Sequence, residues 1–231
     1  MARVIAALIR HGDYQQLSDT PSAHQPFALN AKGLTQGTEL AAILNSFCNA
    51  QQCQIQPMIA TSKLLRAWQT AQQLLIDLNQ PRMQIQQYAD LAERCVGSVA
   101  NLTVAQIREL IKLDPRLDDL PSDWKSDSHY CLPFQGAESL LDAGQRVAKL
   151  LTAEIQILQQ QSSSDQLKIF VGHGAAFRHA AYHLGIIDYE QIALLSMFHC
   201  QPVYIECLQD GSWQHIGGAW KIRSEHSQYT D

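Results

Sequence analysis

The feature that most constrains the fold of this chain is an uninterrupted apolar segment near its start. Residues 4–9 read Val-Ile-Ala-Ala-Leu-Ile and contain no polar residue. A strand buried on both faces has this pattern, whereas a strand with one exposed face alternates. The segment is also far too short to cross a membrane as a helix. We therefore predict a buried strand of a parallel sheet over about residues 2–9, ending before Gly12.

Strand and helix patterns alternate along most of the remaining chain. Such alternation is typical of an α/β fold, here a three-layer α/β/α sandwich with a mostly parallel central sheet. The length of 231 residues fits one domain, 1–231. Ser62 and Thr103 are placed to cap the helices that follow them, and Asp210-Gly211 to form a hairpin turn. The predicted strands cover about residues 2–9, 57–61, 83–88, 167–172, 202–208 and 213–217, and the predicted helices about 35–47, 62–78, 103–113, 138–160 and 175–184.

The least regular part of the chain is predicted to be a lid-like insertion at about residues 98–135. Its second half, residues 114–135, contains three prolines and five aspartates, so we expect a loop with little structure of its own. Residues 224–231 are expected to form a frayed tail.

Composition excludes several classes of function. The formal net charge of −5, from 17 basic and 22 acidic residues, is unlike the basic face of a nucleic-acid-binding protein. No segment has the length of a membrane span or the pattern of a signal peptide, so a cytoplasmic protein without membrane contact is expected. The six cysteines form no C-x-x-C pair, which argues against a structural zinc site. A homodimer is compatible with the sequence.

Reactive side chains follow four of the predicted strands. Arg10 and His11 follow the first strand, Arg66 the second, Glu93 the third and His173 the fourth in the parallel part. In an open α/β sheet, ligands bind outside the carboxyl ends of the strands. The five side chains are therefore expected to converge on one edge of the sheet.

The chemistry of this set is suited to phosphoryl transfer. Two arginines present rigid donor forks that neutralise a phosphoryl group, so no metal and no cofactor are required. A neutral histidine can attack phosphorus and form a covalent intermediate. A glutamate beside bound phosphate is held protonated by the neighbouring negative charge and can act as general acid.

Four ordered segments resemble the histidine phosphatase superfamily, which includes the cofactor-dependent phosphoglycerate mutases. They are Arg10-His11-Gly12, the helix segment 61–71, the loop 91–97 and the strand end 171–174, with weaker matches at 31–37 and 135–139. The resemblance covers residue 4 to about 178. It implies a phosphoglycerate mutase-like fold.

The resemblance also implies a role for each matching residue. His11 is the phosphorylated nucleophile, Arg10, Arg66 and His173 form the phosphate pocket, and Glu93 is the proton donor. Gly12 and Gly174 are assigned to substrate binding, Gly174 because it opens a helix whose N-terminus favours an anion.

Two departures from the family bear on the substrate. Where the mutases carry a serine and an asparagine that touch phosphate, this chain has residues 13–17, Asp-Tyr-Gln-Gln-Leu, in which Gln15 or Gln16 is the candidate substitute. Where the mutases carry basic residues, residues 114–127 hold five aspartates against Arg116 and Lys125. An acidic lid repels a substrate with several negative groups.

The sequence thus predicts a metal-independent phosphatase that acts through a phosphohistidine on His11. Its substrate is expected to be a phosphorylated small molecule or a phosphoprotein. Two alternatives stay open: phosphoglycerate mutase-type transfer, and a catalytically silent binding module on the same fold.

Some residues have competing interpretations. Glu93 could instead form a surface ion pair with its neighbour, in which case Asp90 or Asp127 would be the acid. His179 and His183 have the spacing of a metal-binding pair but lack the glutamate of H-E-x-x-H, which favours packed or solvated side chains. No role is assigned to His199, Cys200 and His215.

Overall fold

The computed structural model describes residues 2–21 and 23–223. The predicted frayed tail, residues 224–231, lies outside the described residues. Within them, the strands form two sheets. The larger sheet contains β1 (Val4–Arg10), β2 (Gln54–Ile55), β3 (Met58–Ser62), β4 (Gln84–Tyr88), β5 (Gln166–Gly172), β7 (Pro202–Cys207) and β8 (Trp213–Gly217), and the smaller one pairs β6 (Leu195–Ser196) with β9 (Lys221–Ile222).

The main sheet has the order β4-β3-β5-β1-β7-β8, with β2 paired to β5. The pairs β1–β5, β2–β5, β3–β4 and β3–β5 are parallel, whereas β7 pairs antiparallel with both β1 and β8. The predicted mostly parallel sheet is confirmed. In this register Arg10 lies opposite Gly172, so the carboxyl ends of β1 and β5 are neighbours.

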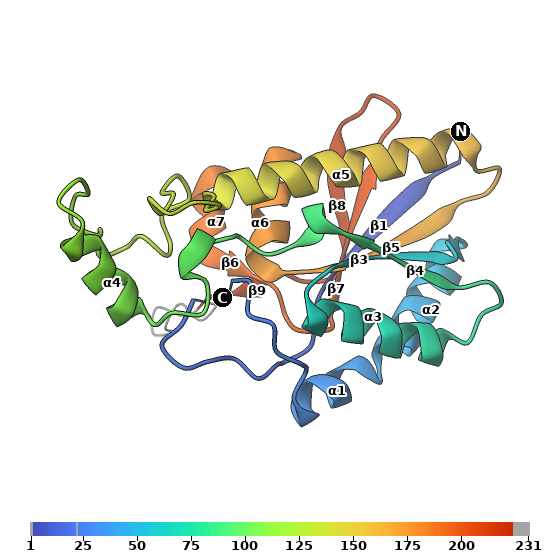
Figure 1. Ribbon diagram of the computed structural model, residues 1–231. Coiled ribbons are helices and arrows are strands. Elements are labelled where there is room, and N and C mark those ends of the chain that lie inside the picture. The colour runs from blue at the N-terminus through green and yellow to red at the C-terminus, as the bar shows by residue number, and fades with distance from the viewer. Residues whose placement is uncertain (1, 22, 224–231) are drawn as a thin grey trace.

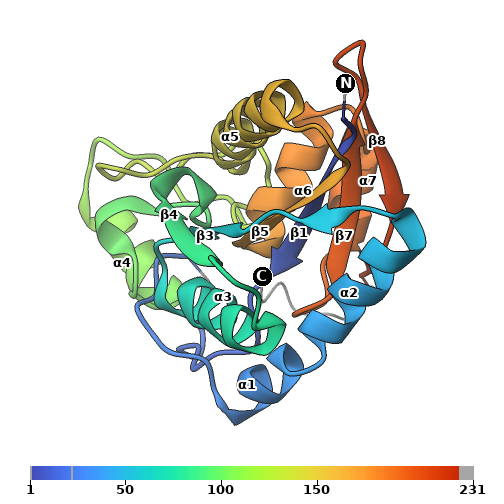
Figure 2. The same cartoon turned by 90° about the vertical axis from the view of Figure 1, so that its right-hand side faces the viewer.

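Helices cover both faces of this sheet, as Figures 1 and 2 show. Two of them, α2 and α3, pack on one face, where α1 contacts both of these helices, and α5 and α6 pack on the other. The helices are α1 (Ala31–Gly37), α2 (Leu40–Gln51), α3 (Leu65–Leu78), α4 (Val104–Leu113), α5 (Leu140–Gln161), α6 (Gly174–His183) and α7 (Tyr189–Leu194), with the short 3₁₀ turns η1 (Ala89–Leu91) and η2 (Gly97–Val99).

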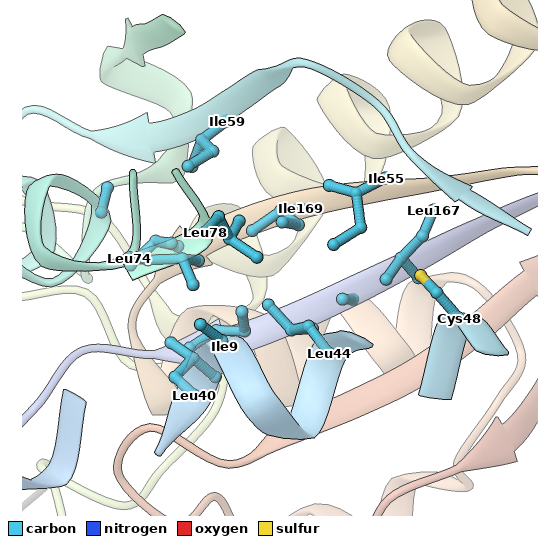
Figure 3. Packing of buried hydrophobic residues seen from close by; sticks show 14 of the residues in the cluster. Ile9, Leu40, Leu44, Cys48, Ile55, Ile59, Leu74, Leu78, Leu167 and Ile169 are labelled. Atoms are coloured by element: carbon cyan, nitrogen blue, oxygen red, sulfur yellow. The ribbon is translucent and has the colours of Figure 1, made fainter. Parts of the chain in front are cut away.

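The apolar run that opens the chain divides its side chains between the two faces. Ile5 and Ile9 belong to the core against α2 and α3, part of which is drawn in Figure 3, and Val4 and Leu8 to the core against α5 and α6. All of β1 is buried, which is why its sequence is apolar up to Arg10, its last residue. Burying an aliphatic side chain of this size contributes roughly 1.5–3 kcal/mol. The cores on both faces fix the strand that ends at the candidate site.

The structure corrects some predicted boundaries. The single helix expected over 35–47 is two helices, because α1 ends at Gly37 and α2 begins at Leu40. Ser62 is the last residue of β3 and does not cap α3, which begins at Leu65. Four short elements were not predicted from the sequence: β2, β6, β9 and α7. A strand of two residues, or a helix of six, is too short to show a periodic pattern of apolar residues.

Residues 114–135 contain neither helix nor strand, as predicted. They are nevertheless packed, since Trp124 and Leu132 are buried against Ile107 and Ile111 of α4 in a small apolar cluster of their own. The proline-rich composition predicts the absence of regular elements but not this cluster. Thr103 caps α4 through a capping box with Gln106, as its position before the helix predicts.

The contact between α5 and α6 fixes the helix that begins at the candidate site. A Cβ atom on Gly144 would lie 2.4 Å from the Cβ of His179, so only glycine permits this approach. His179 is held in place because its Nδ1–H donates to the Ala175 carbonyl and its Nε2 accepts from the Ser128 hydroxyl, at 2.7 and 3.1 Å.

Candidate active site

The carboxyl ends of three neighbouring strands bring four of the predicted site residues together. Arg10 and His11 close β1, His173 follows β5, and Arg66 lies in the first turn of α3, which follows β3. The backbone N–H of His11 donates to the backbone carbonyl of Gly172 at 3.0 Å. This bond continues the pairing of β1 and β5 one residue beyond the end of β1. The rings of His11 and His173 are 5.0 Å apart between centroids.

Arg66 joins the two histidines. Its Nε donates to Nε2 of His11 at 3.0 Å, and its Nη2 donates to Nδ1 of His173 at 3.2 Å. The Arg66 side chain is 0% exposed. It is therefore a buried cation whose donors face ring nitrogens rather than a carboxylate, the arrangement expected of a group that binds an anion.

The chain between β1 and α1 closes over Arg66. The carbonyl oxygens of Gln25 and Ala23 accept from Nη1 and Nη2 of Arg66, each at 2.9 Å. The guanidinium also lies over the ring of Tyr14, 4.5 Å from its centroid, and Tyr14 meets the His11 ring edge-on. Tyr14 thus positions both the arginine and the histidine.

The hydrogen bonds of His11 define its tautomer. Nδ1 lies 2.7 Å from the Gly12 carbonyl, which can only accept, so Nδ1 carries the proton. Nε2 accepts from Arg66 and holds the lone pair. Burial, with Arg66 and Arg10 nearby, keeps the pKa of His11 well below 6.5. The ring is neutral at pH 7, with Nε2 as its nucleophilic atom.

His173 is fixed from both sides. Since its Nδ1 accepts from Arg66, its Nε2 carries the proton and donates to the Ser62 hydroxyl at 2.9 Å. Burial, with Arg66 and His11 nearby, lowers the pKa of His173 well below 6.5. Ser62, which the sequence assigns to helix capping, therefore orients a site histidine.

Glu93 lies at the N-terminus of α6. Its carboxylate accepts from the backbone N–H groups of Ala176 and Arg94 at 3.0 Å and of Ala175 at 3.3 Å. The sequence predicts that the N-terminus of the helix opened by Gly174 favours an anion of the substrate. In the structure, the first N–H groups of α6 bind the carboxylate of Glu93 instead. Glu93 is 5% exposed and is not a surface ion pair.

A second arginine holds the loop that carries Glu93. Arg146 donates to the carbonyl oxygens of Asp90 and Ala92, both at 2.8 Å, and of Glu93 at 3.0 Å. Its guanidinium also forms two hydrogen bonds with the Glu138 carboxylate. Five donor contacts from one side chain fix the backbone on which the candidate acid sits.

The remaining predicted residues occupy different positions. The backbone N–H of Gly12 donates to the Thr70 hydroxyl, and its carbonyl accepts from Nδ1 of His11. A Cβ atom on Gly12 would lie 2.6 Å from the Gly33 carbonyl oxygen. Gly174 is buried beside Arg10, whose Nη1 donates to the Met197 carbonyl. Gln16 is exposed in the segment between β1 and α1.

Neither alternative acid joins the site. Asp90 is exposed in η1, and Asp127 accepts from the backbone N–H groups of His129 and Tyr130 in the irregular segment.

The sequence missed several residues at the site. His199, which was assigned no role, has its ring centroid 5.6 Å from that of His11, and its backbone bridges to Arg10. Tyr14 stands within the run 13–17 that departs from the family pattern. Arg146 lies in a long helix without a motif. Only the nearness of Tyr14 to His11 in the sequence could have indicated a contact.

Of the helical pair His179 and His183, the first is packed and the second is exposed. His179 is buried between α5 and α6, and Nε2 of His183 lies 2.9 Å from the Leu141 carbonyl. In the described ranges, no group of three or more histidine, cysteine or acidic side chains is arranged to hold a metal ion. No helix in those ranges is long and apolar enough to cross a membrane.

Two cavities border the site. One, of about 40 Å³, is lined by Glu93, Ala23 and Ala175 among others. A larger one, of about 360 Å³, is lined by Arg10, Lys32 and His199 among others.

Comparison with known proteins shows the family to which this chain belongs. Residues 6–216 match the model of the histidine phosphatase superfamily (branch 1), and the chain belongs to that superfamily. No curated protein sequence matches it.

Several solved structures share the fold at low identity. A phosphoglycerate mutase from Bacillus anthracis superposes with a TM-score of 0.69 at 17% identity, over 93% of this chain and 92% of that one. A mycobacterial glucosyl-3-phosphoglycerate phosphatase gives 0.67 at 20%, over 96% of each chain. The α-ribazole phosphatase of Shigella flexneri gives 0.67 at 20%, over 92% and 94%.

Buried neutral histidines predict an acid-sensitive fold. The pKa values of His11 and His173 are lowered well below 6.5, and burial lowers that of His179 to about 3. The unfolded chain therefore binds more protons below pH 6.5, and the free energy of unfolding falls as pH falls through that value. Each histidine should remove about 2 kcal/mol between pH 7 and pH 5.

Urea unfolding at the two pH values checks this. His11→Gln should make the loss about 2 kcal/mol smaller than in the wild type, whereas His129→Gln, at an exposed position, should leave it unchanged. An equal loss in His11→Gln and wild type would contradict the account.

Proposed function

We propose that this protein is a metal-independent phosphatase that hydrolyses a phosphomonoester through a phosphohistidine on His11. The observation that carries the proposal is the neutral His11, whose Nε2 lone pair faces a buried arginine at the meeting point of three strand ends. In this proposal residues 98–135 act as a lid. The phosphorylated substrate is a small molecule or a phosphoprotein, and no cofactor takes part.

The first step transfers the phosphoryl group to His11. Nε2 of His11 forms a bond to phosphorus while the bond to the leaving oxygen breaks, and Glu93 gives its proton to that oxygen. Arg10 and Arg66 donate to the phosphoryl oxygens, where negative charge is spread in the transition state. His173 joins them by turning to a phosphoryl oxygen the Nε2–H that it gives to Ser62 in the structure. The Nδ1–H bond to the Gly12 carbonyl stabilises the positive ring that results.

The second step releases phosphate. Water attacks phosphorus and gives a proton to the Glu93 carboxylate, the phosphorus–nitrogen bond breaks, and inorganic phosphate leaves. His11 is neutral again and Glu93 protonated, so the cycle closes without metal. Binding requires Arg66 to move its Nε donor from Nε2 of His11 to a phosphoryl oxygen, because the same lone pair attacks phosphorus.

The alternatives differ in acceptor or in turnover. Phosphoglycerate mutase-type transfer passes the phosphoryl group from His11 to a second hydroxyl instead of water, and a silent binding module transfers nothing. Product analysis after incubation with a phosphomonoester separates inorganic phosphate from a rearranged ester.

The direct test is hydrolysis of an aryl phosphate in excess chelator. The wild type should turn over, since arginines supply the positive charge, and His11→Ala should lower kcat at least about 1,000-fold because the nucleophile is lost. His129→Ala serves as the control. No turnover by the wild type would exclude the phosphatase, and full turnover by His11→Ala would exclude the nucleophile.

Glu93→Gln tests the general acid. The amide can still accept backbone N–H bonds, so the variant removes the transferable proton with little change in shape. The value of kcat/KM, which reports the steps up to phosphorylation of His11, should fall about 100-fold or more for an alkyl phosphate and much less for 4-nitrophenyl phosphate, whose leaving oxygen needs no proton. Glu109→Gln, at an exposed position on α4, is the control. An equal loss for both substrates would contradict the role.

A further inference from the structure

Helix α2 ends in a motif that brings two cysteine side chains together. Gln52, just past the last helical residue, has a left-handed backbone with φ of 53°, and the Cys53 N–H donates to the Cys48 carbonyl at 3.1 Å. This is the Schellman motif, in which the side chains of the donating and the accepting residue frequently pack against each other. In this chain both are cysteines with free thiols, buried in the core against α2 and α3, in which Figure 3 shows Cys48.

The backbone on both sides of Cys53 is held in place. The Gln54 N–H donates to the Asp165 carbonyl at 2.9 Å, where β2 begins its parallel pairing with β5. The Arg3 guanidinium donates to the Gln51 carbonyl at the end of α2, also at 2.9 Å. The two thiols are therefore placed side by side by hydrogen bonds of the folded chain.

The two thiols differ in acidity. The Cys48 thiol donates a hydrogen bond to the Cys53 sulfur, which raises the pKa of Cys48 and lowers that of Cys53. The positive charge of Arg3 also lowers the pKa of Cys53, whereas burial opposes this effect. The thiolate is the reactive form of cysteine. Cys53 is therefore the sulfur that reacts first, beside a second sulfur that still carries its proton.

Three other cysteines have the opposite environment. Burial raises the pKa of Cys200 to about 12, and it also raises the pKa values of Cys131 and Cys207. Cys131 is exposed, whereas Cys48 and Cys53 are only 6% and 8% exposed. Exposure alone thus predicts that an oxidant reaches Cys131 first, and the environment of the buried pair predicts the reverse.

We propose that Cys48 and Cys53 form a reversible oxidation site, which hydrogen peroxide closes to a disulfide and a dithiol reductant opens again. The Cys53 thiolate attacks a peroxide oxygen, the O–O bond breaks, and the leaving hydroxide takes up the proton that the thiol released. The Cys48 sulfur then attacks the sulfenic sulfur of Cys53, and the S–O bond breaks. The hydroxyl leaves as water with the Cys48 proton. Two sulfurs lose two electrons, which reduce the peroxide to two molecules of water.

The disulfide joins the end of α2 to the start of β2, at the opposite end of the sheet from the histidines. Strand β2 pairs with Gln166 and Leu167 at the start of β5, whereas His173 follows the last residue of that strand, Gly172. The length of β5 separates the two ends by about 20 Å. The disulfide therefore acts on the stability of the fold, and the proposal does not depend on the proposed phosphatase function.

Peptide mapping tests the proposal. Residues 33–63 form one tryptic peptide, which contains Cys48 and Cys53 and no other cysteine. After treatment of the full chain with equimolar hydrogen peroxide in chelator, then iodoacetamide, this peptide should be lighter by two hydrogens and carry no label. Cys131 should still be labelled, and dithiothreitol added before iodoacetamide should restore two labels to the peptide. Oxidation of Cys131 while peptide 33–63 keeps both labels overturns the proposal.

Serine variants separate the roles of the two sulfurs. Cys48→Ser keeps a hydroxyl that can donate to Cys53 but removes the second sulfur, so dimedone should trap a sulfenic acid on Cys53 that the wild type does not accumulate. Cys53→Ser should leave Cys48 reduced. Cys131→Ser is the control and should close the disulfide as the wild type does. Equal dimedone labelling of Cys53 in the wild type and in Cys48→Ser overturns the pairing.

Thermal unfolding measures the effect on the fold. The disulfide closes a loop of six residues, 48–53, so oxidation should raise the Tm of the wild type by about 4–8 °C. The same treatment should leave the Tm of Cys53→Ser unchanged. An oxidised wild type that melts no higher than the reduced protein overturns the stabilising role.

Discussion

The arrangement of the site depends on the hydrogen bonds of one buried side chain, Arg66. It contacts both histidines and the carbonyl oxygens of Ala23 and Gln25, and so joins α3, two strand ends and the loop after β1. An arginine can do this because its planar fork offers five donors in fixed directions. Lysine offers no such geometry. The strands bring the histidines near each other, and Arg66 fixes their orientation.

The N-terminus of α6 is the second constraint on the site. Its N–H groups hold the Glu93 carboxylate, while the loop before it is fixed by Arg146. The position of the Glu93 side chain therefore depends on the packing of α6 against α5. Gly144 permits the close approach of these two helices. Residues far from the two histidines in sequence thereby set the position of the Glu93 carboxylate.

The sequence indicated the fold, because the period of apolar residues is a property of each segment alone. It also indicated His11, Arg10, Arg66 and His173, since the ends of parallel strands must meet at one edge. It could not place Tyr14, Arg146 or His199, whose contacts depend on how loops close. It assigned Gln16, which is exposed, to the substrate, and that assignment stays a prediction. Composition could not say that Lys125, and none of the five aspartates of residues 114–127, lines the cavity beside Glu93.

The most direct test of the account is where the phosphoryl group rests during turnover. Rapid mixing with an aryl phosphate, quenching in base and mapping of the labelled peptide should place phosphorus on Nε2 of His11, with the intermediate forming at least as fast as kcat. No phosphoenzyme should form in the His11→Ala variant. Phosphorus on another residue, or burst-free hydrolysis in which no phosphoenzyme forms at a competent rate, would contradict the central claim.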